Sequence, residues 1–191
     1  MLKKFIILMI FPLLALSAED KYVIDKTHFA VGFLVEHVGY AKTLGMFRDI
    51  DGSYSHDLTN NKINNINISI KTGSVFTNHD KRDQHLMSPD FLNVEKYPEM
   101  SFKATDISIQ DDITNISGEL TLLGVTKPLI LTGKINKIGK YPFGGIIKPY
   151  VMGISARGTI KRSQHGMNYA LKDDLVGDEI DLIIEFEARR Q

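Results

Sequence analysis

The sequence predicts an all-β protein with an antiparallel sheet and one short helical insert. Eight or nine segments after residue 20 alternate apolar and polar residues with a period of two, as half-buried strands do. Short turns join them, which favours antiparallel pairing. Residues 77–104 break the alternation and carry helix-start signals instead. A sheet of this length removes its edges by closing on itself, but the period alone fits a barrel and a sandwich equally well.

The first 18 residues have the layout of a secretory signal peptide. Lys3 and Lys4 form a short basic region, residues 5–16 are apolar apart from Pro12, and Ser17 and Ala18 are small. We place cleavage after Ala18, although cleavage after Ser17 also fits. The apolar run is shorter than the roughly 20 residues that cross a bilayer. We therefore expect residues 19–191 to form one exported, soluble domain with no stable membrane anchor.

Composition narrows the classes of function. The chain has no cysteine, so neither a disulfide nor a lipid-modified cysteine is expected. Removal of Lys3 and Lys4 reduces the basic residues from 23 to 21, against 23 acidic ones, for a net charge of −2. Such a balance gives no overall basic excess that would hold nucleic acid or an anionic membrane by charge alone.

The strands follow one another in a regular order. We expect them at residues 21–25, 28–38, 44–56, 62–72, 100–109, 113–123, 127–138, 150–162 and 177–188. Gly45 and Gly52 are expected to mark bulges or bends. The last segment has apolar residues on one face and acidic ones on the other, and only Ile183 departs from this pattern.

The insert combines two helix-start signals. Thr77 or Asn78 is expected to cap a first helix, with Asp80 and Asp83 placing negative charge in its first turns. Residues 88–90, Ser-Pro-Asp, give a second start of the kind in which proline occupies the first helical position. Such an insert would cover one end of a barrel.

The insert also carries a family resemblance. Residues 82–92 read Arg-Asp-Gln-His-Leu-Met-Ser-Pro-Asp-Phe-Leu and are followed by Tyr97-Pro98 and Phe102. This run resembles the signature of the YceI family, and residues 118–128, Gly-Glu-Leu-Thr-Leu-Leu-Gly-Val-Thr-Lys-Pro, are similar to its second recurring segment. The resemblance covers nearly all of the mature chain. It implies a periplasmic, closed, eight-stranded lipocalin-like β-barrel that binds a long isoprenoid-type ligand.

Three other kinds of site have weaker support. His79, Asp80, Asp83 and His85 offer metal-ligand atoms but lack a His-x-x-x-His spacing. No Gly-x-Ser-x-Gly motif and no cysteine nucleophile occur. Gly144-Gly145 is followed by Ile-Ile rather than by the Lys-Ser/Thr of a phosphate loop. We therefore expect no enzyme activity, no cofactor and no metal.

The hypothesis we favour is an apolar cavity with a polar rim. Bulky apolar residues at strand positions are expected to line it, namely Phe33, Val35, Phe47, Phe102, Leu120, Leu122, Met152, Ile154, Ile184 and Phe186. Met87, Phe91 and Leu92 of the insert would close it. The alternative is that the same side chains simply fill a packed core.

Arginines and histidines supply the candidate polar groups. The resemblance implies that Arg82 and His85 lie near the ligand or hold the insert in place, and His28 and His37 also match family positions. Between these roles for Arg82 we favour the structural one, with Asp83 as its partner.

A second arginine matches the family less well. Arg162 corresponds to an arginine that precedes a Phe-Gly pair, but His165 stands in place of that phenylalanine. If the ligand carries an anionic head, Arg82, Arg162 or Lys42 would bind it through charge-assisted hydrogen bonds.

The predicted function is sequestration or transport of a long-chain isoprenoid or fatty-acyl amphiphile. Two alternatives stay open at this point: an enzyme acting on a lipid- or quinone-like molecule in the same cavity, and a protein-interaction module with a packed barrel. The sequence does not fix the oligomeric state, because an exposed strand edge would also support a homodimer.

Overall fold

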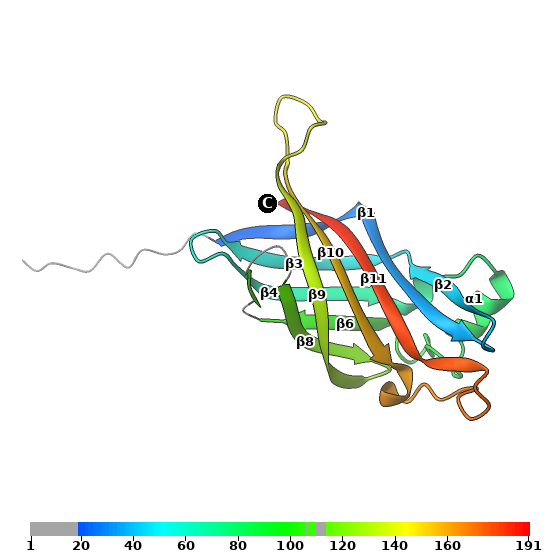
Figure 1. Ribbon diagram of the computed structural model, residues 1–191. Coiled ribbons are helices and arrows are strands. Elements are labelled where there is room, and N and C mark those ends of the chain that lie inside the picture. The colour runs from blue at the N-terminus through cyan, green and yellow to red at the C-terminus, as the bar shows by residue number, and fades with distance from the viewer. Residues whose placement is uncertain (1–18, 106, 110–113) are drawn as a thin grey trace, which may run out of the picture.

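Eight antiparallel strands close into a barrel in the computed structural model, which describes residues 19–105, 107–109 and 114–191 (Figure 1). In ring order they are β1 (Glu19–His37), β3 (Ile50–Asp57), β4 (Lys62–Lys71), β6 (Glu99–Ala104), β8 (Thr114–Leu122), β9 (Val125–Lys140), β10 (Tyr150–Lys161) and β11 (Val176–Arg190). β11 pairs back onto β1 and completes the ring. The predicted eight-stranded barrel is confirmed. The predicted signal peptide, residues 1–18, lies outside the described residues.

The long first strand pairs with three other strands. Its first part pairs with β3, its second part with the short strand β2 (Ala41–Phe47), and its other edge with β11. Two further short strands, β5 (Val75–Phe76) and β7 (Ile107–Ser108), pair with β2 and β4. The sequence analysis divided β1 into two strands and joined β2 to β3. Both boundaries were wrong. β1 runs without interruption from Glu19 to His37. The break between β2 and β3 lies at residues 48–49, where the hydroxyl of Ser74 accepts both backbone N–H groups.

Irregular pairing lies at positions other than the predicted glycines. Gly45 pairs regularly with Phe33, and Gly52 with Ile68, so neither marks a bulge. The irregularity in the β3–β4 pair falls instead at Asn65, which has a left-handed φ of 55°. This extra residue shifts the side-chain alternation. As a result Ile63 faces the interior together with the isoleucines at 66, 68 and 70.

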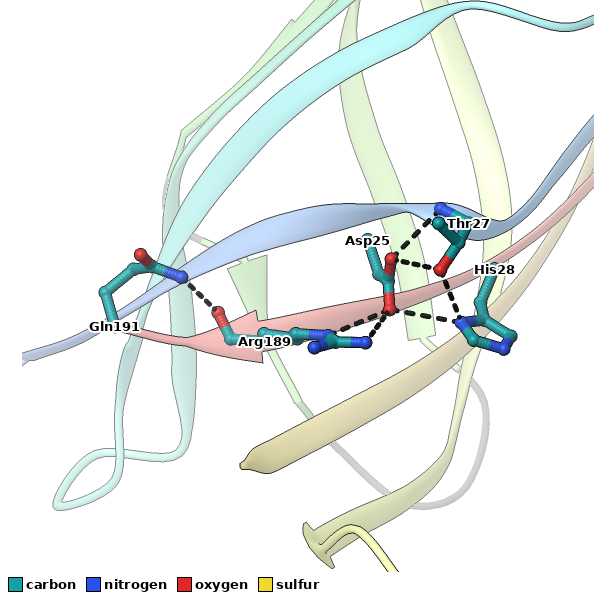
Figure 2. Close-up of polar contacts among 5 residues, drawn as sticks. All are labelled: Asp25, Thr27, His28, Arg189 and Gln191. Carbon is teal, nitrogen blue, oxygen red and sulfur yellow. Dashed lines mark hydrogen bonds and ion pairs between the residues drawn. The ribbon is translucent and has the colours of Figure 1, made fainter. Parts of the chain in front are cut away.

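A second irregularity lies where β1 leaves β3 and continues along β11. Between Ile24 and Phe29 the register shifts, and Asp25 turns its carboxylate toward β11 (Figure 2). The carboxylate accepts hydrogen bonds from Thr27 N at 3.0 Å and from Arg189 Nε at 2.9 Å, and it lies 3.1 Å from His28 Nδ1. Burial raises the pKa of Asp25, but these hydrogen bonds outweigh burial and hold the pKa well below its usual range.

The insert contains one helix rather than two. Helix α1 (Asp80–Met87) is capped by His79, whose Nδ1 accepts from the Arg82 backbone N–H at 3.2 Å. Thr77 and Asn78 were therefore the wrong caps. The second predicted helix is absent from the described residues, because Ser88 ends α1 and turns follow it. Asn93, with φ of 45°, accepts the Tyr97 N–H at 2.8 Å in one of these turns.

Two buried clusters fill the interior differently. The smaller contains Tyr22, Met152 and Ala188, each fully buried, together with Tyr54, whose ring stacks on that of Tyr22 at a centroid distance of 5.3 Å. We call these four residues the packed end. The larger cluster lies between the barrel wall and the insert, and it includes Phe91 of the turns after α1.

Candidate ligand cavity

A cavity of about 870 Å³ occupies the barrel interior. All eight ring strands contribute side chains to it, and so do α1 and the turns that follow. Its size falls within the range of pockets that enclose a small-molecule ligand, roughly 300–1,000 Å³. The predicted apolar lining residues that border it are Phe33, Val35, Phe47, Phe102, Leu120, Leu122, Ile154, Ile184 and Phe186, with Phe91 and Leu92 from the insert.

Two of the predicted lining residues lie elsewhere. Met152 is fully buried in the packed end and does not border the cavity. Met87 packs against the larger cluster, whereas its neighbour Leu86 is the residue of α1 that reaches the cavity. Alternation in strands and helices identifies a buried face, but it does not distinguish a filled section of the interior from a hollow one.

Glycines in the wall help to keep the interior hollow. Gly45 of β2 and Gly118 of β8 face the interior, and a Cβ atom at either position would lie within 3.0 Å of the ring of Phe33 or Phe102. The missing side chains let each ring lie against the neighbouring strand instead of extending toward the barrel axis. The same close approach recurs where Ile68, Ile116 and Leu131 cover Gly52, Gly133 and Gly158.

A cluster of three rings borders the cavity on the side of the insert. The imidazole of His85 meets Phe91 and Tyr169 edge to face, at centroid distances of 5.0 Å and 4.9 Å. His85 Nε2 also lies 2.9 Å from a carboxylate oxygen of Asp90. His85 therefore borders the cavity and at the same time packs the insert against the loop that carries Tyr169.

Arg82 borders the cavity but uses part of its guanidinium to hold the insert. Its Nε donates to Thr77 Oγ1 at 2.7 Å and its Nη2 to Thr77 O at 2.6 Å. Asp83 accepts from the Thr77 N–H at 2.8 Å. The predicted structural role of Arg82 thus acts through Thr77, on which Arg82 and Asp83 converge.

Arg162 donates to the backbone of its own loop and of the start of β11. Only 1% of the residue is exposed, and its donors reach four carbonyl oxygens at 2.6–3.0 Å, those of Met167, Tyr169, Val176 and Gly177. Burial lowers the pKa of Arg162, and Asp178 opposes that shift. A guanidinium remains charged even so. Arg162 thus borders the cavity, and its guanidinium holds together the loop before β11 and the start of that strand.

The remaining candidate polar groups are divided between the cavity and the outer surface. His37 borders the cavity. His28 lies instead with Asp25 where β1 and β11 meet, a place that we call the seam. Lys42 forms an ion pair with Asp181. Of the cationic side chains named from the sequence, Arg82 is therefore the one with both a position at the cavity and a partly exposed environment.

Possible metal ligands come together at the seam and not in the insert. Asp25, His28 and Glu187 each offer an atom within 4.8 Å of the others. The carboxylate of Asp25, however, already binds the Arg189 guanidinium, which supplies the positive charge there. His79, Asp83 and His85 have separate partners, namely Arg82 N–H, Thr77 and Asp90.

Sequence reasoning missed several cavity residues. Leu129 and Leu131 lie on a predicted strand with the correct alternation, so the period-two pattern could have identified them. Tyr169 comes from an irregular loop, and Gly45, which lies under the ring of the lining residue Phe33, was expected to mark a bulge or bend. No local sequence signal distinguishes those two.

A closed eight-stranded β-barrel with an internal apolar cavity defines the class of small ligand-binding barrels. The model of the YceI-like domain matches residues 22–188 of this chain. UPF0312 protein plu2095 of Photorhabdus laumondii is 40% identical over 93% of this chain and 89% of its own length. Protein YceI of Escherichia coli is 39% identical over 93% and 90%. The chain belongs to the YceI family.

Solved structures agree with this assignment. The Campylobacter jejuni YCEI protein has a TM-score of 0.70 at 29% identity, over 82% of this chain and 90% of that one. Two more distant proteins share the fold: Burkholderia cenocepacia BcnA (TM-score 0.73, 16% identity, 86% and 98% covered) and a polyisoprenoid binding domain from Saccharophagus degradans (TM-score 0.68, 12% identity, 89% and 98% covered).

Within the described ranges, no helix has both the length and the apolar character needed to cross a bilayer.

Proposed function

We propose that this protein binds a long-chain isoprenoid or fatty-acyl amphiphile inside the barrel and sequesters or transports it. The observation that carries the proposal is the cavity of about 870 Å³, whose lining is dominated by apolar side chains from every ring strand. Burial of an apolar chain contributes roughly 25 cal/mol per Å² before the costs of binding are subtracted. The description of the Saccharophagus neighbour as a polyisoprenoid binding domain supports the same ligand class.

The shape of the cavity favours a long, slender ligand. Its lining follows β9 from Leu129 to Ile138. Nine residue steps along a strand cover roughly 30 Å. A chain of isoprene units or methylene groups would use this length, whereas a compact molecule would leave part of it empty.

The polar rim supports a defined orientation of the ligand. Glu36, His37, Lys81 and Arg82 border the cavity near the insert. Arg82 is held by Thr77 and would place a fixed cation there, to which a phosphate, carboxylate or carbonyl oxygen would bind. We therefore propose that the polar head of the ligand lies at the insert and that its chain extends along the barrel.

We further propose that residues 1–18 direct export to the periplasm and are removed, and that residues 19–191 act there as a binding protein without catalysing a reaction. Uptake and release of an unchanged ligand would be sufficient for this role.

Native mass spectrometry of the mature protein, followed by organic extraction, tests the proposal. We expect one long-chain lipid per chain, removable by extraction and restored by an added polyprenyl or fatty-acyl compound. Phe33→Asp places a charge on the lining and should abolish retention. Ile130→Asp, at an exposed position of β9, is the matched control. A protein that takes up no such compound would contradict the proposal and favour a packed interaction module, and a chemically altered ligand would favour an enzyme.

A further inference from the structure

The loop that joins β9 to β10 projects away from the barrel (Figure 1). Residues 141–149, which we call the finger, read Tyr-Pro-Phe-Gly-Gly-Ile-Ile-Lys-Pro. Three large apolar side chains at its tip are exposed: Phe143 by 73%, Ile146 by 105% and Ile147 by 91%. A cluster this exposed at adjacent positions is a usual mark of a contact surface rather than of scattered surface residues.

The base of the finger is closed, so its apolar tip is held apart from the wall. The Tyr141 N–H donates to Pro149 O at 2.8 Å, and Lys148 Nζ donates to Pro142 O at 3.2 Å. The ring of Tyr141 meets that of Phe143 edge to face at 6.0 Å, which orients the first of the apolar side chains.

The surroundings of the tip are basic. Residues 134–149, which include the finger and the part of β9 that leads into it, contain four lysines and no acidic residue, although the chain as a whole is balanced. Lys137, Lys140 and Lys148 are exposed on the finger and on the end of β9 that leads into it. Of the acidic groups on neighbouring strands, Asp20 is paired with Arg190. Glu187, opposite Gly153, lies in the seam cluster with Asp25 and His28.

We propose that the finger docks the protein on a bilayer that carries anionic lipids. Apolar side chains at a tip enter the interface between head groups and acyl chains, while flanking lysines contact anionic head groups. A stable protein partner would need roughly 800 Å² on each side. Three side chains on one narrow loop do not offer such a surface, whereas a bilayer requires no complementary shape.

Docking at the finger would also bring the cavity near the membrane. The cavity lining on β9 continues to Ile138, two residues before the strand ends at Lys140 and the finger begins. The binding step itself does not depend on the proposed lipid-carrier function, since the finger contributes no residue to the cavity lining.

Tryptophan fluorescence tests the docking directly, because the chain contains no tryptophan. In Phe143→Trp the single indole reports on the finger tip. We expect its emission to shift to the blue, and to be quenched by brominated lipid, when vesicles of equal parts phosphatidylglycerol and phosphatidylcholine are added. Ile130→Trp is the matched control, because Ile130 is 62% exposed on the same strand but distant from the finger. Its emission should not change.

Sedimentation with the same vesicles separates the contribution of the apolar tip from that of the lysines. Replacing Phe143, Ile146 and Ile147 together with serine should lower partitioning by at least about tenfold. Lys140→Gln with Lys148→Gln should weaken binding to the anionic vesicles by about tenfold, and high salt should remove this difference. Both variants should still take up a lipid ligand in solution, so failure to dock is distinguishable from failure of the cavity.

Three results would overturn the proposal. One is the absence of a blue shift in Phe143→Trp with vesicles at low salt. Another is an equal shift in Ile130→Trp. The third is a shift that requires no lipid and grows with protein concentration, which would identify the finger as a contact between copies of the chain.

Discussion

The packed end and the hollow part of the barrel are built from the same strands but use their interior positions differently. Tyr22, Tyr54 and Met152 belong to one buried cluster at the packed end, where the rings of Tyr22 and Tyr54 stack and where Tyr54 alone of the three borders the cavity. In the hollow part, Phe33 and Phe102 lie over glycines of neighbouring strands, so the space at the centre remains open. The difference shows that burial alone does not define a site, because Phe33 in the hollow part is 9% exposed and Tyr54 in the packed end 3%.

The two regions should therefore respond differently to substitution. A change in the packed end should affect stability and leave ligand binding intact. A change in the hollow part should alter binding, with a smaller cost to stability when the side chain borders empty space on one side.

The largest effect on stability is expected at Met152. Met152→Ala removes a fully buried side chain from the packed end and should lower the free energy of unfolding by about 2–5 kcal/mol. Denaturation in urea measures this loss, and the ligand stoichiometry should remain unchanged. Val35→Ala, in the cavity lining, is the contrasting variant. It should cost about 1 kcal/mol and weaken binding. If the two variants lost stability and ligand binding to the same extent, the distinction between the two regions would be wrong.

Substitution of one glycine in the barrel wall should affect both stability and ligand binding. Gly118→Ala places a methyl group within 3.0 Å of Phe102 and of the Lys103 carbonyl oxygen, so the ring must swing toward the barrel axis. We expect a loss of about 2 kcal/mol in stability and a clear loss of ligand capacity. Gly153→Ala is the matched control on β10, because no atom lies near its added Cβ. Undiminished ligand capacity in Gly118→Ala would contradict the role assigned to the wall glycines.

The contacts of Asp25 at the seam predict that the free energy of unfolding depends on pH. The folded state lowers the pKa of Asp25, so its contribution to stability is fully present above the unfolded pKa of about 3.9. That contribution is lost as the pH falls below this value. Asp25→Asn should cost about 1–2 kcal/mol at neutral pH and progressively less in acid. Urea unfolding of both proteins between pH 7 and strongly acid pH measures the difference. A difference that does not depend on pH would contradict this account.

The smallest effect is expected at the hydroxyl of Tyr22. Among the described residues, the hydroxyl groups of Tyr22 and Tyr54 and both ring nitrogens of His56 are buried without a hydrogen-bond partner. Tyr22→Phe removes one such group and keeps the stacked ring, so stability should stay within about 0.5 kcal/mol of the parent or increase. A loss above about 2 kcal/mol in thermal or urea unfolding would show that the hydroxyl has a partner.

Much of the fold could be predicted from alternation. The apolar face of β11 was predicted from alternation, because acidic side chains on one face of a strand leave only the other face to be buried. The barrel rather than a sandwich came from the family resemblance. The bulge at Asn65 and the single long strand β1 could not be foreseen, since each depends on the register of a partner strand that is distant in the sequence.

The candidate site was predictable to a smaller degree. Phe33 and Leu120 were placed in the lining because alternation identifies interior positions, and the structure places both there. Met152 shows the limit of that reasoning. It also occupies an interior position, but whether an interior side chain borders the cavity depends on how all the strands of the barrel pack together. Arg162 shows another limit, since two of its four carbonyl partners, those of Met167 and Tyr169, lie on a loop whose path no local pattern encodes.

The affinity of the delipidated mature protein for polyprenyl alcohols of increasing length tests the central claim most directly. If one chain lies along the hollow barrel, affinity should rise with each added isoprene unit and then level off when the cavity is full. Phe33→Asp should abolish that dependence. Affinity that is independent of chain length, or that is the same in the parent and in Phe33→Asp, would contradict the account.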